Sequence, residues 1–159
     1  MSKIQVAILM GSKSDAEVMS EAKKVLEEFG VSCEMKVLSA HRTPKETVSY
    51  VEKFPAQGGK IFICGAGMSA ALAGTVSAHT PLPVIGVPLD ASLGGIDSLL
   101  STVQMPPGVP VASVAIGKAG AKNAGFLALR ILGLSDEGLK KKLEAYRDDQ
   151  RKKILETKL

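Results

Sequence analysis

The stretch KIQVAILMGSKSD at residues 3–15 carries the strongest structural signal in the chain. It begins with an apolar run rich in Ile and Val that stops at Gly11, and apolar residues then recur at helical spacing over residues 15–29. This change of period predicts a strand, a tight turn and a helix. A helix that starts directly after a strand presents free backbone N–H groups and the positive end of its dipole, which favour a bound anion such as phosphate.

The alternation of strand and helix continues along the chain. Apolar runs predict further strands over residues 31–38, 60–64, 82–87 and 109–116, and helical spacing predicts helices over residues 45–54, 68–78, 98–105 and 120–132. Gly65, Ala66 and Gly67 are expected to form a turn. Such alternation is typical of a parallel sheet covered on both faces, with ligands bound beyond the carboxyl ends of the strands. We therefore expect the loops at residues 11–15, 39–44 and 65–74 to form the functional edge.

A charged amphipathic helix is predicted over residues 136–159, after a stop at residues 133–135. Its length leaves two interpretations open. Either the helix packs on a neighbouring subunit, or it lies on its own domain or frays into solvent. With no linker or repeat in the sequence, we predict one domain over residues 1–159 with a core over residues 3–133.

Composition restricts the class of protein. The chain has 159 residues, of which 45% are hydrophobic, but it has no apolar segment of the length that a signal peptide or membrane span needs, so we expect a cytoplasmic protein. The formal net charge of +4 arises largely from lysines and arginines near the C-terminus without interleaved aromatic residues, which favours a solvated helix face over nucleic-acid binding. Cys33 and Cys64 lie in apolar runs and are predicted to be free thiols.

Several side chains on the predicted loops have two interpretations each. His41 is a candidate acid or base, or a histidine that only hydrogen-bonds its loop. Arg42 offers a forked donor for phosphate or carboxylate, or makes a surface ion pair. Ser12 and Ser14 add hydroxyl donors, while Asp15 accepts from a ribose hydroxyl or caps the helix.

Other residues are weaker indications of a functional site. His79 ends a predicted helix, where a structural role at the helix C-terminus is favoured. Gly94 and Gly95, like Gly65 and Gly67, would let backbone approach a ligand closely, although such glycines are often only turns. The sequence has no metal-ligand spacing and no nucleophile elbow, so we predict neither a metal nor a covalent nucleophile.

A family resemblance rests on motifs distributed in order over about residues 4–133. They are GSKSD at 11–15, SAHRTP at 39–44, PVIGVP at 83–88, DSLLS at 97–101, VQMP at 103–106, and AIGKAGA at 115–121 with Asn123 and Ala124. The sequence resembles the catalytic subunit of phosphoribosylaminoimidazole carboxylase. The same family includes the N5-carboxyaminoimidazole ribonucleotide mutase of purine biosynthesis.

The resemblance implies a flavodoxin-like, three-layer αβα fold with a C-terminal helical extension. It also implies a homo-octamer with active sites between subunits, no metal or organic cofactor, and a small ribonucleotide substrate. His41 would be the acid/base, and Ser12, Asp15 and Arg42 would hold the ribose phosphate. The substrate-binding residues expected from the resemblance and the loops are Gly11, Ser12, Ser14, Asp15, Ser39, Ala40, Arg42, Gly65, Ala66, Gly67, Met68 and Leu72.

One segment departs from the family pattern. Many bacterial mutases have Gly-Gly-Ala-Ala-His-Leu-Pro-Gly, whereas this chain has MSAALAG at residues 68–74, with Ala71 in place of the second histidine. Ser69 and Leu72 faintly resemble the direct carboxylase branch, while residues 42–44 and the downstream motifs favour the mutase.

The sequence leaves three functions open. The mutase moves a carboxylate from the exocyclic nitrogen to ring carbon C4 in de novo purine (IMP) biosynthesis and would be coupled to the ATP-dependent synthetase that makes its substrate. The carboxylase would use carbon dioxide directly. A non-catalytic nucleotide- or flavin-binding module is the alternative of another class, because the fold also hosts such binders.

Overall fold

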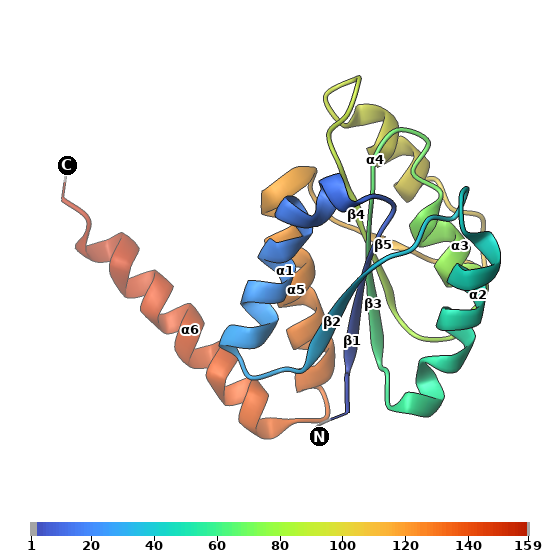
Figure 1. Ribbon diagram of the computed structural model, residues 1–159. Coiled ribbons are helices and arrows are strands. Elements are labelled where there is room, and N and C mark those ends of the chain that lie inside the picture. Colours follow the sequence, from blue (N-terminus) through green and yellow to red (C-terminus); the bar gives the residue numbers. More distant parts are fainter. Residues whose placement is uncertain (1–2, 159) are drawn as a thin grey trace.

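Five parallel strands form a sheet with helices on both faces (Figure 1), in a computed structural model that describes residues 3–158. The strand order is β2-β1-β3-β4-β5, which is the flavodoxin-like order. The predicted three-layer αβα fold is thus confirmed. The elements are β1 (Val6–Met10), the 3-10 helix η1 (Lys13–Asp15), α1 (Ala16–Glu28), β2 (Cys33–Val37), α2 (Pro44–Lys53), the 3-10 helix η2 (Pro55–Gln57), β3 (Ile61–Ala66), α3 (Leu72–Ala78), β4 (Val84–Pro88), α4 (Ile96–Val103), β5 (Ala112–Ser113), α5 (Gly117–Gly133) and α6 (Glu137–Glu156).

The central strands are buried on both faces, which explains their continuous apolar runs. Side chains alternate between the two faces, since successive residues of a strand point in opposite directions. Ile8 and Ile63 pack with α1 and α5 on one face, and Leu9 and Phe62 pack with α2 and α3 on the other. The aliphatic core predicted from the composition is therefore divided into two layers.

The register of the strands determines where the loops meet. Met10, the last residue of β1, lies opposite Val37 at the end of β2 and opposite Gly65 near the end of β3. Ala66 in turn lies opposite Pro88, the last residue of β4. Four strands thus end together, and the loops that follow them gather at one edge of the sheet.

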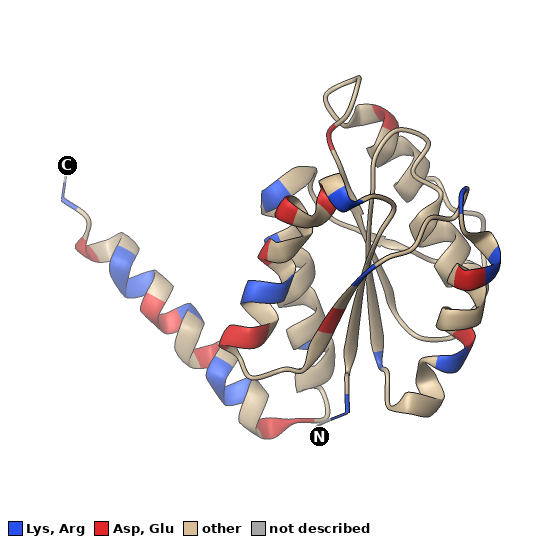
Figure 2. Cartoon of the chain, in the orientation of Figure 1, with Lys and Arg blue, Asp and Glu red and all other residues tan. Residues whose placement is uncertain are grey.

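The helical extension, α6, has two different halves. Leu139 is buried, and Leu143 and Tyr146 pack against the core beside Phe29 and Phe126. Beyond them the helix extends away from the body of the protein (Figure 1). Figure 2 shows acidic and basic residues mixed along it, and ion pairs such as Lys153 with Asp149 at 2.7 Å fit a solvated helix face. None of the helices within residues 3–158 is both long and apolar enough to cross a membrane.

Several predicted boundaries were wrong, among them those of three segments. Residues 65–67 are no simple turn, because β3 continues through Ala66. The helix predicted over residues 68–78 begins only at Leu72, because Met68 has a left-handed backbone with φ of 56°. The strand predicted over residues 109–116 is reduced to Ala112–Ser113, since it is an edge strand and Pro110 has no N–H to donate.

Candidate active site

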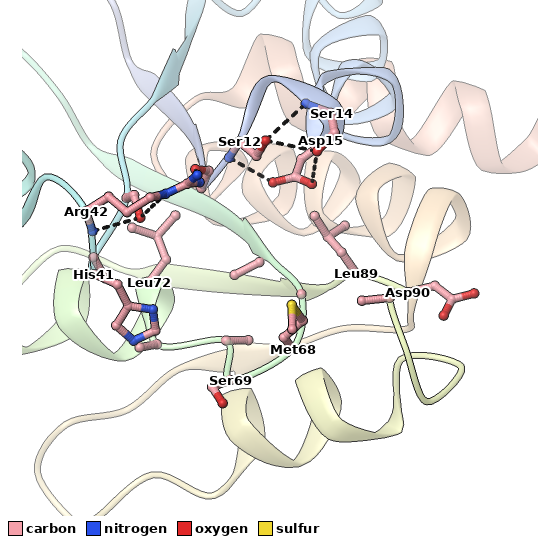
Figure 3. Close-up of a pocket in the computed structure, with 18 residues that line it drawn as sticks. Ser12, Ser14, Asp15, His41, Arg42, Met68, Ser69, Leu72, Leu89 and Asp90 are labelled. Atoms are coloured by element: carbon pink, nitrogen blue, oxygen red, sulfur yellow. Dashed lines mark hydrogen bonds between the residues drawn. The ribbon is translucent and has the colours of Figure 1, made fainter.

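A cavity of about 500 Å³ lies at the edge where the four strands end (Figure 3). The loops after β1, β2, β3 and β4 all contribute to its wall. The sequence analysis expected the first three of these loops. The lining residues are Gly11, Ser12, Ser14, Asp15, Ser39, Ala40, His41, Arg42, Ala66, Gly67, Met68, Ser69, Ala70, Ala71, Leu72, Leu89, Asp90 and Ala91.

The loop after β1 forms a capping box. The Ser12 backbone N–H donates to Asp15 Oδ2 at 3.0 Å, and the Ser14 N–H donates to Ser12 Oγ at 3.4 Å. Asp15 thus closes the capping box of the 3-10 helix η1, whereas its side chain makes no capping hydrogen bond to α1, the helix that it was expected to cap. The Ser14 hydroxyl also lies 3.0 Å from Ser12 Oγ and 3.3 Å from Asp15 Oδ1. The hydroxyls and the carboxylate therefore form one connected polar group on the cavity wall, which can both donate to and accept from a sugar or phosphate.

The loop after β2 is held by its own side chains. Thr43 Oγ1 accepts from the Ser39 N–H at 2.9 Å and donates to the Ser39 carbonyl oxygen at 3.1 Å. The Ser39 hydroxyl accepts from the Arg42 N–H at 3.2 Å, and Pro44 then starts α2, where its fixed φ suits the first helical turn. Sequence reasoning missed the bracing role of Thr43. It follows that His41 projects from a rigid loop.

His41 lies at the cavity, away from the capping box. Figure 3 shows its imidazole well separated from Ser12 and Asp15. None of the hydrogen bonds found within residues 3–158 involves this ring, so the structure does not support a purely loop-bracing histidine. The cavity thus has a polar end and a separate end where an imidazole can exchange a proton.

Arg42 connects the two loops. Its Nη2 donates to the Gly11 carbonyl oxygen, and its Nε lies 3.5 Å from Ser39 Oγ. No acidic partner within 4.0 Å was found for it in residues 3–158, which weighs against the surface ion pair considered above. The guanidinium instead lies beside the capping box, where it can offset the charge of Asp15 and of a bound phosphate.

Part of the cavity wall is apolar. Leu72, Leu89 and Ala70 line the cavity and are buried. Asp90 adds a carboxylate that the sequence analysis missed, although its position just after β4 could have indicated it. Ala91 was also missed, while Ser69, Ala70 and Ala71 lie in the loop that was expected at this edge but were not named as binding residues.

Gly65 does not line the cavity. It lies in β3, where an added Cβ would come within 2.3 Å of Met19 Sδ. This close approach of α1 gives the glycine a packing role. Its expected contact with a substrate finds no support in this position.

Tyr50 joins α2, the helix that follows the His41 loop, to β2. Its hydroxyl donates to Glu34 Oε1 at 2.7 Å, and Lys36 Nζ lies 4.4 Å from the centre of its ring. Burial, together with the neighbouring Glu34 carboxylate, raises the pKa of Tyr50 far above its usual range. Tyr50 therefore stays a hydrogen-bond donor and anchors the helix that begins directly after the loop.

The remaining candidates lie outside the cavity. His79 ends α3 as predicted, with Nδ1 3.7 Å from Glu52 Oε1. Cys33 and Cys64 are free thiols, and burial raises the pKa of Cys64 so far that no thiolate nucleophile is expected. Within residues 3–158 no three His, Cys, Asp or Glu side chains gather as a metal site would require.

Comparison with known proteins identifies the family. The model of the family described as AIR carboxylase matches residues 5–153. The chain belongs to the AIR carboxylase family.

Other members of the AIR carboxylase family are similar over nearly the whole chain. The N5-carboxyaminoimidazole ribonucleotide mutase of Saccharolobus solfataricus is 50% identical over 156 residues, which cover 98% of each chain. The enzyme of the same name from Bacillus subtilis is 52% identical over 153 residues, covering 96% of this chain and 94% of the relative. The crystal structure of Treponema denticola PurE is 33% identical, with a TM-score of 0.87 over 96% of this chain and 94% of that one.

Proposed function

We propose that this chain converts N5-carboxyaminoimidazole ribonucleotide into 4-carboxy-5-aminoimidazole ribonucleotide, a step of de novo purine biosynthesis. It would be an isomerase that moves a carboxylate within its substrate. The observation that carries the proposal is the meeting of His41, Arg42 and the Ser12–Asp15 capping box at one cavity. Relatives about 50% identical over nearly the whole chain bear the name of this mutase.

The polar end of the cavity suits the ribose phosphate. Arg42 provides a forked cationic donor, and the hydroxyls of Ser12 and Ser14 provide neutral donors to phosphate oxygens. The Asp15 carboxylate is better suited to a ribose hydroxyl, because two anions in contact would repel each other. The nucleotide would thus be oriented with its base toward His41.

The proton transfer would be carried out by His41. As the carboxylate leaves the exocyclic nitrogen as carbon dioxide, the imidazolium delivers a proton to that nitrogen. C4 of the ring then attacks the carbon dioxide, and the neutral imidazole removes the C4 proton, which restores the starting state. Leu72, Leu89 and Ala70 form an apolar wall that would keep water away from the released carbon dioxide.

The direct carboxylase remains the second candidate because of Ala71. This residue lines the cavity in the segment where many bacterial mutases have their second histidine. The mutase is favoured by the relatives' names, and by the motifs at residues 42–44, 97–101 and 103–106, which resemble that branch. A single imidazole, that of His41, would then serve both proton transfers.

We also propose that the chain assembles with copies of itself, as a homo-octamer, in the cytoplasm. An exposed apolar stripe runs along α4 and the loop before it, formed by Leu93, Ile96, Leu100 and Val103. Ile96, Leu100 and Val103 recur at helical spacing on one side of α4, which is typical of a helix that packs on a partner. Functional coupling to the ATP-dependent synthetase of the pathway would deliver the N-carboxylated substrate.

The test offers the purified protein two substrates in parallel. One reaction contains the N-carboxylated ribonucleotide without bicarbonate, and the other contains the uncarboxylated ribonucleotide with bicarbonate. Formation of the C4-carboxylated product from the first alone supports the mutase, and efficient use of the second would assign the direct carboxylase. Product from neither would refute both and support a nucleotide-binding module.

A further inference from the structure

The N-cap residue of α2 does not cap its own helix. Thr43 stands at this position, where a threonine side chain commonly accepts a hydrogen bond from the N–H of the second or third helical residue. Here the side chain makes no capping hydrogen bond, although the first N–H groups of a helix have no acceptor within it. A hydroxyl that leaves its helix uncapped points to another use for this group.

The Thr43 hydroxyl binds back to Ser39 instead. Thr43 Oγ1 accepts from the Ser39 N–H at 2.9 Å and donates to the Ser39 carbonyl oxygen at 3.1 Å. The Thr43 N–H donates to the same oxygen at 2.9 Å. Because the two residues flank Ala40, His41 and Arg42, these three bonds close a short ring of chain around His41. We call them the Thr43 clasp.

Removing the hydroxyl would open one side of the Thr43 clasp. The bond from the Thr43 N–H to the Ser39 carbonyl oxygen would remain, but the Ser39 N–H would lose its acceptor, and no other acceptor was found for it within residues 3–158. An unpaired N–H on a partly buried residue is costly. The backbone of Ser39 is therefore expected to turn toward another acceptor, and such a turn would displace His41, two residues later.

From these bonds we infer that Thr43 is a positioning residue, which holds the His41 imidazole where it exchanges protons with the ribonucleotide. This inference rests on the proposed mutase function. Thr43 does not line the cavity, so it acts through His41 and not on the substrate. An imidazole that delivers a proton to the exocyclic nitrogen and later removes one from C4 must stay within hydrogen-bond reach of both atoms. A displacement of about 1 Å can lower a rate by about 100-fold.

Thr47 provides a matched comparison on the same helix. It is fully buried, and its hydroxyl donates to the Thr43 carbonyl oxygen at 2.8 Å, with a longer contact of 3.4 Å to the Ser39 carbonyl oxygen. Both carbonyl groups also accept from backbone N–H groups, those of Thr47 and Thr43. Thr47→Val therefore removes a threonine hydroxyl beside the loop and leaves the Thr43 clasp closed.

Four variants of the full chain are compared with the wild-type protein. Thr43→Val and Thr43→Ala remove the hydroxyl of the clasp, Thr43→Ser keeps it, and Thr47→Val is the control. For each, kcat, KM and the melting temperature are measured, together with the NMR signals of ¹³C-labelled histidine rings. Because the chain has two histidines, His41→Asn assigns the His41 signals, and the His79 signals serve as an internal reference.

We expect Thr43→Val and Thr43→Ala to lower kcat by about tenfold to 100-fold. KM should change much less, because Arg42 keeps its separate bond to the Gly11 carbonyl oxygen. The His41 ring signals should broaden or split in both variants while those of His79 do not change, since a released loop moves between several positions. Thr43→Ser and Thr47→Val should retain the kcat and the ring signals of the wild-type protein.

The opposite outcomes are as clear. Wild-type kcat in Thr43→Val and Thr43→Ala would overturn the inference, and so would an equal loss of kcat in Thr43→Ser or Thr47→Val. A lower melting temperature with unchanged kcat and unchanged His41 signals would assign Thr43 a purely structural role. An inactive wild-type protein would instead refute the proposed function, while the ring signals, which need no turnover, would still test whether the clasp holds His41.

Discussion

The guanidinium of Arg42 donates a hydrogen bond to the carbonyl oxygen of Gly11, and so ties the loop after β2 to the loop after β1. Two segments that are far apart in the sequence thereby hold a fixed spacing across the polar end of the cavity. Because His41 precedes Arg42 directly, the same contact also fixes the loop that carries the acid/base.

Replacing Arg42 with Lys tests this contact. Lysine keeps the charge but loses the planar fork, so it cannot donate to Gly11 and to a phosphate in the same geometry. We expect KM for the N-carboxylated ribonucleotide to rise by about tenfold, as loss of a charge-assisted hydrogen bond predicts. Steady-state kinetics measure the change. Lys45→Ala is the control, since this nearby exposed cation does not line the cavity, and an equal KM defect there would contradict a specific role for Arg42.

The two histidines offer a matched pair for the proton transfer. His41→Asn should lower kcat by about two orders of magnitude or more with unchanged circular dichroism and nucleotide binding, because a positioned acid/base is lost. His79→Asn should leave kcat unchanged, since His79 lies outside the cavity at the end of α3. Normal turnover of the His41 variant would refute the mechanism.

Two glycines of α5 should respond to alanine in opposite ways. A Cβ on Gly120 would lie only 1.6 Å from the Ala115 carbonyl oxygen, so Gly120→Ala should lower the free energy of unfolding by about 2–4 kcal/mol. A Cβ on Gly133 would lie 3.6 Å from Leu143 Cδ1, an ordinary contact. Gly133→Ala should therefore be neutral or stabilising by up to about 1 kcal/mol. Urea unfolding measures both, and equal effects would contradict the close approach at Gly120.

The distal half of α6 should matter for assembly. Ile154 and Leu155 are 75% and 69% exposed on a helix segment that leaves the body of the protein. Isolated helices of this length are marginal in water, so a partner surface is expected to cover them. Replacing both with Ser should lower the particle mass measured by light scattering, while replacing the exposed Lys152 and Glu156 with Ser should not. An unchanged mass in the first variant would favour a helix that frays into solvent.

The layers of the fold could be predicted because the local apolar patterns of the sequence agree with the overall architecture. The apolar run of β1 and the helical period of α1 specify one strand-helix unit, and its repetition specifies a parallel sheet. Since parallel strands end at one edge, the meeting of the Gly11 loop with the His41 loop was also predictable. Ser12 and Asp15 have the local spacing of a capping box, but this box was not predicted, because Asp15 was expected to cap α1 itself.

Other features depend on tertiary structure that no local pattern encodes. Met68 is left-handed although methionine favours helices, so the start of α3 was misplaced. Gly65 lies under Met19 rather than in a turn, because α1 approaches β3 there. Asp90 was missed because sequence patterns reveal a strand but do not show which residues of the loop after it line a cavity.

The central claim is that the carboxylate is moved within one closed site, and an isotope experiment tests it most directly. The N-carboxylated ribonucleotide is prepared with ¹³C in its carboxylate and is turned over by the wild-type protein in buffer that contains unlabelled bicarbonate. The account predicts that the C4-carboxylated product retains the ¹³C label. Product that carries carbon from the unlabelled bicarbonate would contradict the closed transfer and would assign the chain to the direct carboxylases.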